Sequence, residues 1–145
     1  MKTQKIYFLF PFFLIVLGVL SAIFTYYYFP QLIPSYGGGE VIKLNSNNNY
    51  EMSYGFEPRF RLLISIEVDN PVVININQEE KFSGIDYSVT LNTSLYYVIN
   101  IKGTMLTEGF MKLKQEIPTL YQLFTFGLLL SGILLYIFYI HLKKR

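Results

Sequence analysis

RFRLLISIEVDN, residues 59–70, places an apolar side chain at every even position from Phe60 to Val68. Polar side chains such as Arg61 and Glu67 lie between them. A period of two is typical of a β-strand with one face buried and one face in water. The sequence therefore predicts a long core strand here, within a chain whose two ends have a different composition.

The chain as a whole is too apolar for an ordinary soluble domain. Of its 145 residues, 52% are hydrophobic and only 15% are charged, whereas a typical domain has about 25% charged residues. The excess lies at the ends, because no charged residue occurs between Lys5 and Glu40 or between Glu116 and Lys143. This distribution predicts a membrane protein in which two apolar spans flank the β-forming segment.

The first apolar run, residues 6–29, has 24 residues without a charge. As a helix it would be about 36 Å long at roughly 1.5 Å per residue, and the hydrocarbon core is about 30 Å thick. A cleaved signal peptide is the alternative, but its apolar region is usually only about 7 to 15 residues long. The aromatic exit at residues 26–29 favours an uncleaved helix, which Pro11 bends. The second span is predicted at residues 117–142.

Basic residues mark both tips of the chain. Residues 1–5 contain Lys2 and Lys5, and residues 143–145 read KKR. Lysine and arginine next to apolar helices are typical of the cytoplasmic side of a membrane. We therefore predict that both termini are cytoplasmic and that residues 30–116 lie outside the cell membrane.

Each predicted span contains a pair of small residues four positions apart. These pairs are Gly18 with Ala22 in the first span and Gly127 with Ser131 in the second. Small residues at this spacing let helix backbones approach closely inside a membrane. We predict that the four residues are helix-packing positions, either between the two spans or against another membrane protein.

The segment between the spans predicts an all-β domain. Residues 30–39 form a linker rich in proline and glycine, and the hydrophobic period is two from residue 40 to residue 116. Alternating wet and dry faces predict antiparallel sheets packed face to face in a small β-sandwich. The seven candidate strands are residues 40–44, 50–56, 59–69, 72–77, 85–92, 95–102 and 110–115.

Part of this segment resembles a known group of modules. A long apolar strand is followed by the turn DNP at 69–71, the strand LYYVINIKG at 95–103 and FMKLKQ at 110–115. This pattern resembles the small jelly-roll modules of the pre-peptidase C-terminal type over residues 59–115. The resemblance implies a jelly-roll-like fold, and no binding residue is carried over from it.

The composition of the middle segment limits which partners and which catalytic reactions it can have. It has seven basic and ten acidic residues, a net charge of −3, which argues against nucleic acid as a partner. The chain lacks cysteine, and its single histidine, His141, falls beside the predicted cytoplasmic tip. Nucleophilic catalysis of the Ser-His-Asp or Cys-His type is therefore excluded for the chain alone. No cofactor or metal site is predicted.

Residues 92–94, Asn-Thr-Ser, match the acceptor pattern for N-glycosylation, so Asn92 is a candidate modification site. We expect a non-enzymatic membrane protein that contacts the lipid bilayer and other membrane proteins or a second copy of itself. In this reading it is an accessory subunit of a membrane complex or an assembly factor of the cell surface. The alternatives are a surface module that binds glycan or another polymer, and a hydrolase that uses two carboxylates.

Overall fold

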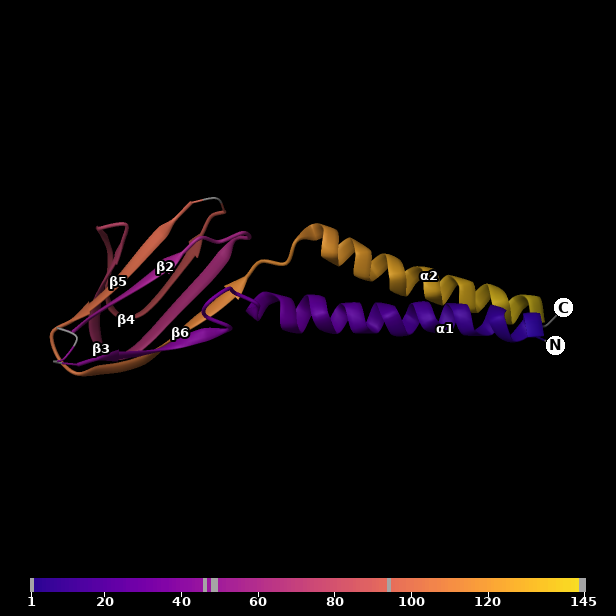
Figure 1. Ribbon diagram of the computed structural model, residues 1–145, viewed down its shortest axis with the longest axis horizontal. Coiled ribbons are helices and arrows are strands. Elements are labelled where there is room, and N and C mark those ends of the chain that lie inside the picture. Colours follow the sequence, from indigo (N-terminus) through magenta and orange to yellow (C-terminus); the bar gives the residue numbers. More distant parts are fainter. Residues whose placement is uncertain (1, 46, 48–49, 94, 144–145) are drawn as a thin grey trace. The chain divides into compact units, whose positions relative to one another are not determined.

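The computed structural model describes residues 2–45, 47, 50–93 and 95–143 (Figure 1). The chain forms two compact units, and each is considered by itself. The first unit consists of the two terminal apolar segments, up to Phe29 and from Ile117 onward. The second unit is the β domain, Pro30–Glu116.

The first unit is helical, as the two charge-free runs predict. Helix α1 spans Lys2–Ile23 and is continuous through Pro11. It is followed by a π-helical turn, Phe24–Tyr28, and a short 3₁₀ turn, Phe29–Gln31. Helix α2 spans Thr119–Lys143. Two apolar helices at the ends of the chain therefore flank the β domain, and this part of the prediction is confirmed.

Each terminal helix buries one narrow stripe of side chains. Along α1 and the π-helical turn that follows it, the buried positions Pro11, Gly18 and Thr25 are seven residues apart. In α2, Thr125 and Gly132 are likewise buried and seven residues apart. A spacing of seven keeps residues on one helical face, which is the seam between two helices that pack along their length. Most of the other described side chains of these helices are exposed and apolar.

The β domain is one antiparallel sheet of six strands (Figure 1). The strand order is β1-β6-β3-β5-β2, and β4 pairs with β3. The strands are β1 Gly39–Leu44, β2 Glu51–Phe56, β3 Leu62–Ile76, β4 Glu79–Leu91, β5 Tyr97–Gly103 and β6 Thr107–Gln115.

The long strand β3 causes the sheet to curl. Its first half pairs with β6 and its second half with β5, while β4 pairs with both halves. Between the halves, the register of β3 against β4 shifts after Glu67 and resumes at Val72. The bend is tied to the start of β6 and to the loop before it, since the Glu108 N–H donates to Asp69 at 2.9 Å and the Asn70 amide donates to the Leu106 carbonyl at 2.8 Å.

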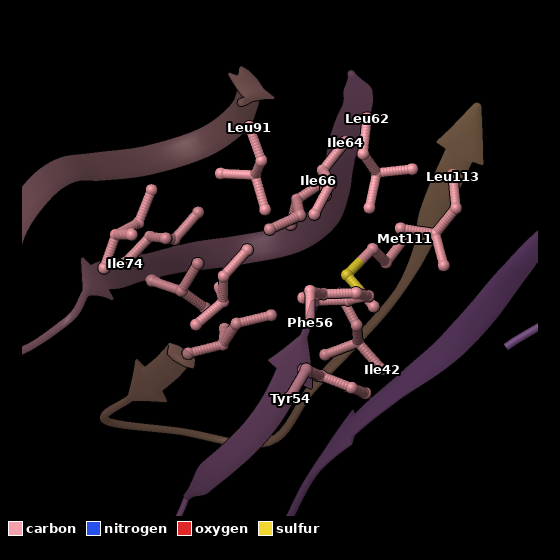
Figure 2. Packing of buried hydrophobic residues seen from close by; sticks show 14 of the residues in the cluster. Ile42, Tyr54, Phe56, Leu62, Ile64, Ile66, Ile74, Leu91, Met111 and Leu113 are labelled. Carbon is pink, nitrogen blue, oxygen red and sulfur yellow. The ribbon is translucent and has the colours of Figure 1, made fainter. Parts of the chain in front are cut away.

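The inner face of the curled sheet encloses the hydrophobic core. Figure 2 shows side chains from both halves of β3 and from β1, β2, β4 and β6 gathered there. Because side chains alternate between faces, the even positions of the opening stretch are the ones that point inward. The buried members are Ile42, Leu44, Tyr54, Phe56, Leu62, Ile64, Ile66, Val72, Ile74, Ile76, Leu91, Ile99, Ile101, Met111 and Leu113.

The strand count and the origin of the two layers differ from the sequence prediction. The segments 59–69 and 72–77 belong to one strand, because the residues at 69–71 make a bend and not a chain reversal. Residues 79–84, expected in a loop, are paired in β4. The reversal is instead a tight turn at Asn77 and Gln78, both with positive φ (51° and 72°), as a two-residue hairpin requires. The layers come from one curled sheet, not two separate sheets.

Candidate functional site

Three of the described strands have a free side. Strand β1 pairs with β6 alone, β2 with β5 alone, and β4 with β3 alone. In an antiparallel ladder, consecutive residues direct their backbone N–H and C=O groups alternately to the two sides of the strand. Every second residue of an edge strand therefore presents a donor and an acceptor that the sheet does not use, and such a row can pair with another chain.

The free sides of β1 and β2 have partners within the domain. On β1, the Lys43 N–H donates to the sulfur of Met52 on β2 at 3.3 Å. On β2, the carbonyl of Gly55 accepts a hydrogen bond from the Tyr36 hydroxyl at 3.1 Å. The Tyr36 ring also lies 4.8 Å from the ring of Phe56, centroid to centroid. Each of these two edges therefore has at least one outward backbone group that is already bonded within the domain.

The direction of the backbone groups of β4 follows from a hydrogen bond at the start of β3. The Glu116 N–H donates to the Arg61 carbonyl at 2.7 Å, on the β6 side of the chain. Odd-numbered residues in this half of β3 therefore bond to β6, and even-numbered ones bond to β4. The β4 residues opposite the even ones are Tyr87, Val89 and Leu91. These three residues direct their backbone groups into the sheet.

The intervening residues of β4, Asp86, Ser88 and Thr90, direct their backbone N–H and C=O groups away from the sheet. All three are exposed. Within the described ranges, no backbone or side-chain group forms a hydrogen bond to these amides and carbonyls. We call this stretch, residues 86–90, the open edge. It is the edge of the sheet that is ready for main-chain pairing with another chain.

The opposite end of β4 is protected against such pairing. Lys81 forms an ion pair with Glu79, and Glu80 lies between them. Hydrogen bonding and the charge of Lys81 hold the pKa of Glu79 below its usual range. The register against β3 also shifts at this point, which makes a bulge. Charges and bulges are the features that keep sheet edges from pairing, so the accessible part of β4 is the open edge.

The helix-packing glycines differ in what surrounds them. A Cβ atom on Gly18 would lie 2.7 Å from Cδ2 of Leu129, and one on Gly132 would lie 2.8 Å from Cγ1 of Ile15. A Cβ atom on Gly127 would meet nothing within 4 Å. The close approach of α2 to α1 is therefore at Gly132, which the small-residue pattern did not single out.

The other two small residues of the predicted pairs have modest roles in the hairpin. Ala22 is half-buried, one turn beyond Gly18. The Ser131 hydroxyl donates to the Leu128 carbonyl of its own helix at 3.1 Å. Neither residue makes a hydrogen bond across to the other helix in the part of the chain that the structure describes.

A cluster of three hydroxyl groups joins the helices beside the π-helical turn. The Thr125 hydroxyl is 2.8 Å from the Ser21 hydroxyl and 3.2 Å from that of Thr25, and both threonines are buried. Thr25 belongs to the π-helical turn, in which the Phe29 N–H bonds to the Phe24 carbonyl five residues back. Hydroxyl pairs of this kind join helices in membranes. Ser and Thr inside the apolar runs were the available sequence signal.

The candidate glycosylation site, Asn92, is exposed and follows the last residue of β4. Its backbone N–H donates to the Tyr97 hydroxyl at 3.3 Å. The third residue of the acceptor pattern, Ser94, lies outside the described residues. Asn92 therefore directly follows the open edge in the chain.

A row of polar side chains crosses the outer face of the sheet. Ser53, Asn100 and Asn75 occupy paired positions on β2, β5 and β3. The Ser53 hydroxyl donates to Oδ1 of Asn100 at 2.6 Å, and Oδ1 of Asn75 is buried without a partner among the described atoms. The strongly exposed aromatic side chains of the domain are Tyr96, before β5, and Phe110, on β6. In the described residues these rings do not form a row.

The described acidic side chains do not gather in a way that would hold a metal ion. Among the residues that the structure describes, no group of three or more His, Asp or Glu side chains is close enough to bind one. Half of the ten carboxylates are instead in pairs with lysine or arginine at the surface, such as Glu67 with Lys112 at 2.9 Å. Exposed pairs of this kind contribute little to stability.

No protein-family model matches this sequence, and no curated protein matches it. Among solved structures, the chain is similar to a de novo designed double-stranded β-helix, with 12% identity and a TM-score of 0.40, over 54% of this chain and 97% of that one. It is also similar to a β-glucosidase from Kluyveromyces marxianus in complex with glucose, with 12% identity and a TM-score of 0.36, over 52% of this chain and 12% of that one. Neither similarity bears on function at these TM-scores.

Proposed function

We propose that this protein is a non-enzymatic integral membrane protein whose β domain lies outside the cell and binds another protein. In this role it is an accessory subunit of a membrane complex or an assembly factor of the cell surface. The open edge of β4 is the observation that carries the proposal.

Membrane insertion is supported by the helices. Leu9–Gln31 and Thr119–Lys143 are long and apolar enough to cross a membrane, with mean hydropathies of 2.3 and 2.2. Only 17% and 11% of these segments are buried, whereas the core helix of a soluble protein is mostly buried. Their exposed apolar surface is unfavourable in water, and lipid would bury it. The basic tips favour an arrangement with both termini in the cytoplasm.

Binding at the open edge would use main-chain hydrogen bonds. An extended segment of the partner placed beside β4 can bond to the N–H and C=O of Asp86, Ser88 and Thr90, six groups in all. At about 0.5–1.5 kcal/mol per bond, these bonds contribute roughly 3–9 kcal/mol before the cost of ordering the partner. Side chains of the partner strand that lie over Ile85, which is 52% exposed, would add apolar contact.

One observation favours the alternative of a glycan-binding module. Oδ1 of Asn75 has no partner among the described atoms, and Asn100 and Ser53 lie beside it on the outer face. Amide and hydroxyl groups are suited to hydrogen bonds with sugar hydroxyls. Exposed aromatic rings usually complete such a site, and only two of the domain's described aromatic side chains, Tyr96 and Phe110, are exposed, so protein binding is the better-supported function.

The test is recovery of the tagged protein from its native membrane in mild detergent. We expect a stoichiometric partner with the wild type and with Thr90→Ala, which keeps the backbone N–H. Thr90→Pro removes that N–H, which the sheet does not use, and should release the partner. Circular dichroism of both variants checks that the domain remains folded.

Hydrogen exchange provides a readout that needs no variant. In the complex, the amide protons of Ser88 and Thr90 should exchange more slowly than in the free protein. Their exchange should be unchanged if the partner binds elsewhere. Retention of the partner by Thr90→Pro, together with unprotected amides, would rule out pairing at the open edge.

A further inference from the structure

Both chain connections of the β domain leave from the same end of the sheet. The linker is held at this end, because Gln115, the last residue of β6, donates from Nε2 to the Leu32 carbonyl at 3.1 Å. Leu32 is three residues beyond Phe29, and Thr119, where α2 begins, is three residues beyond Glu116. Three residues span at most about 10 Å. Only three residues of chain therefore join this end of the domain to each helical segment.

The loop between β4 and β5 lies at this same end. Leu62 pairs with Gln115 on one side and with Leu91 on the other, so the end of β6 and the end of β4 are in one cross-strand row. The loop that follows Leu91 carries two large exposed side chains, Leu95 at 57% and Tyr96 at 64%. Leu32, in the linker, is 54% exposed. Three exposed apolar side chains therefore share the tethered end of the domain.

We propose that Leu95 and Tyr96 form a contact with the surface of the same bilayer that the helices cross. The inference rests on the proposed membrane anchoring. A tyrosine ring is suited to this position because it combines an apolar body with a polar hydroxyl, and such rings are enriched at membrane interfaces. The partner of the loop is lipid, at the level where headgroups meet acyl chains.

Tyr96 lies against the sheet. A Cβ atom on Gly55 would lie 2.5 Å from the Tyr96 hydroxyl, so the ring reaches back over a glycine of β2. The lack of a side chain at Gly55 leaves room for this oxygen. Leu95, the residue before Tyr96, is exposed and therefore accessible to lipid.

The charges of the connecting segments at this end balance. Glu57 and Glu116 are opposed by Arg59 and Arg61, and the last of these pairs with Glu116 at 3.5 Å. A balanced surface does not require anionic lipid for attraction. The contact should therefore form equally well on phosphatidylcholine vesicles and on vesicles that also contain phosphatidylglycerol.

The experiment uses the full-length protein, which contains no tryptophan, so a single introduced tryptophan reports one position. The variants are Leu95→Trp in the loop, Leu106→Trp in the loop before β6, and Leu130→Trp in α2. Leu106 is 68% exposed and lies beyond the other end of the nine-residue strand β6, and Leu130 is 61% exposed. Each variant is reconstituted into phosphatidylcholine vesicles with and without brominated acyl chains, which quench nearby tryptophan.

We expect quenching and a blue-shifted emission for Leu95→Trp and Leu130→Trp, and neither effect for Leu106→Trp. Quenching of Leu130→Trp without quenching of Leu95→Trp would overturn the loop contact while leaving the membrane anchor intact. An unquenched Leu130→Trp would instead overturn the membrane anchor itself. Quenching of Leu106→Trp in place of Leu95→Trp would mean that the opposite end of the domain meets the lipid, which also overturns the inference.

Discussion

Replacing Gly132 by alanine tests whether α1 and α2 pack through a close backbone contact. The added Cβ would lie 2.8 Å from Cγ1 and 3.0 Å from the backbone nitrogen of Ile15, and 3.2 Å from Cβ of Leu14. A backbone atom cannot rotate away as a side chain can, so the helices must move apart. Overpacking of this kind costs about 1–3 kcal/mol.

The matched control is Gly127→Ala in the same helix. A Cβ atom there meets nothing within 4 Å. Both substitutions replace glycine inside α2, so the gain in helix propensity, about 1 kcal/mol in water, is common to both and cancels in the comparison. The difference between the variants should therefore be the overpacking cost, which corresponds to roughly a 5- to 140-fold change in the equilibrium constant for helix separation.

The assay is energy transfer between dyes on cysteines introduced at Leu9 and Leu142, since the chain has no cysteine of its own. Titrating SDS into mild detergent separates the helices and lowers the transfer. Gly132→Ala should separate at a lower SDS fraction than Gly127→Ala. Equal midpoints would refute the close contact, and a lower midpoint for Gly127→Ala would mean that α2 presents a different face to α1.

Three further outcomes are expected. Thr125→Val, which removes both interhelical hydroxyl contacts, should lower the free energy of helix separation by about 1 kcal/mol in the same titration. In a host that glycosylates exported proteins, Asn92 should stay unmodified because the proposed lipid contact covers that end of the domain. Met105→Asn, which creates an acceptor sequence at the opposite end, should show a glycan by gel shift. Burial, and then the charge of Glu40, raise the pKa of the Tyr54 hydroxyl above its ordinary value of 10.0. This group therefore stabilises the fold below pH 10, and the contribution is lost as pH rises further. In denaturant unfolding, Tyr54→Phe should lose less stability than the wild type above pH 10.

Much of the architecture is readable from the order of the residues. The charge-free ends predict the two helices, because length and polarity are properties of one continuous segment. The even-numbered residues from Leu62 to Ile66 are buried, as the period of two requires. Such patterns are local, so the sequence alone determines that the two ends form helices, that the middle forms strands and which face of a strand is buried.

The pairing of distant segments was decided only in the tertiary structure. The bend at residues 69–71 has the composition of a turn, yet it bonds to Leu106 and Glu108, and β3 continues through it as one strand. Likewise, Gly127 and Gly132 are equivalent by composition, but the rotation of α2 against α1 places only Gly132 in contact. The open edge of β4 results from the strand order, in which β4 pairs with β3 alone. These outcomes depend on contacts between residues far apart in the chain, which periodicity within one segment does not encode.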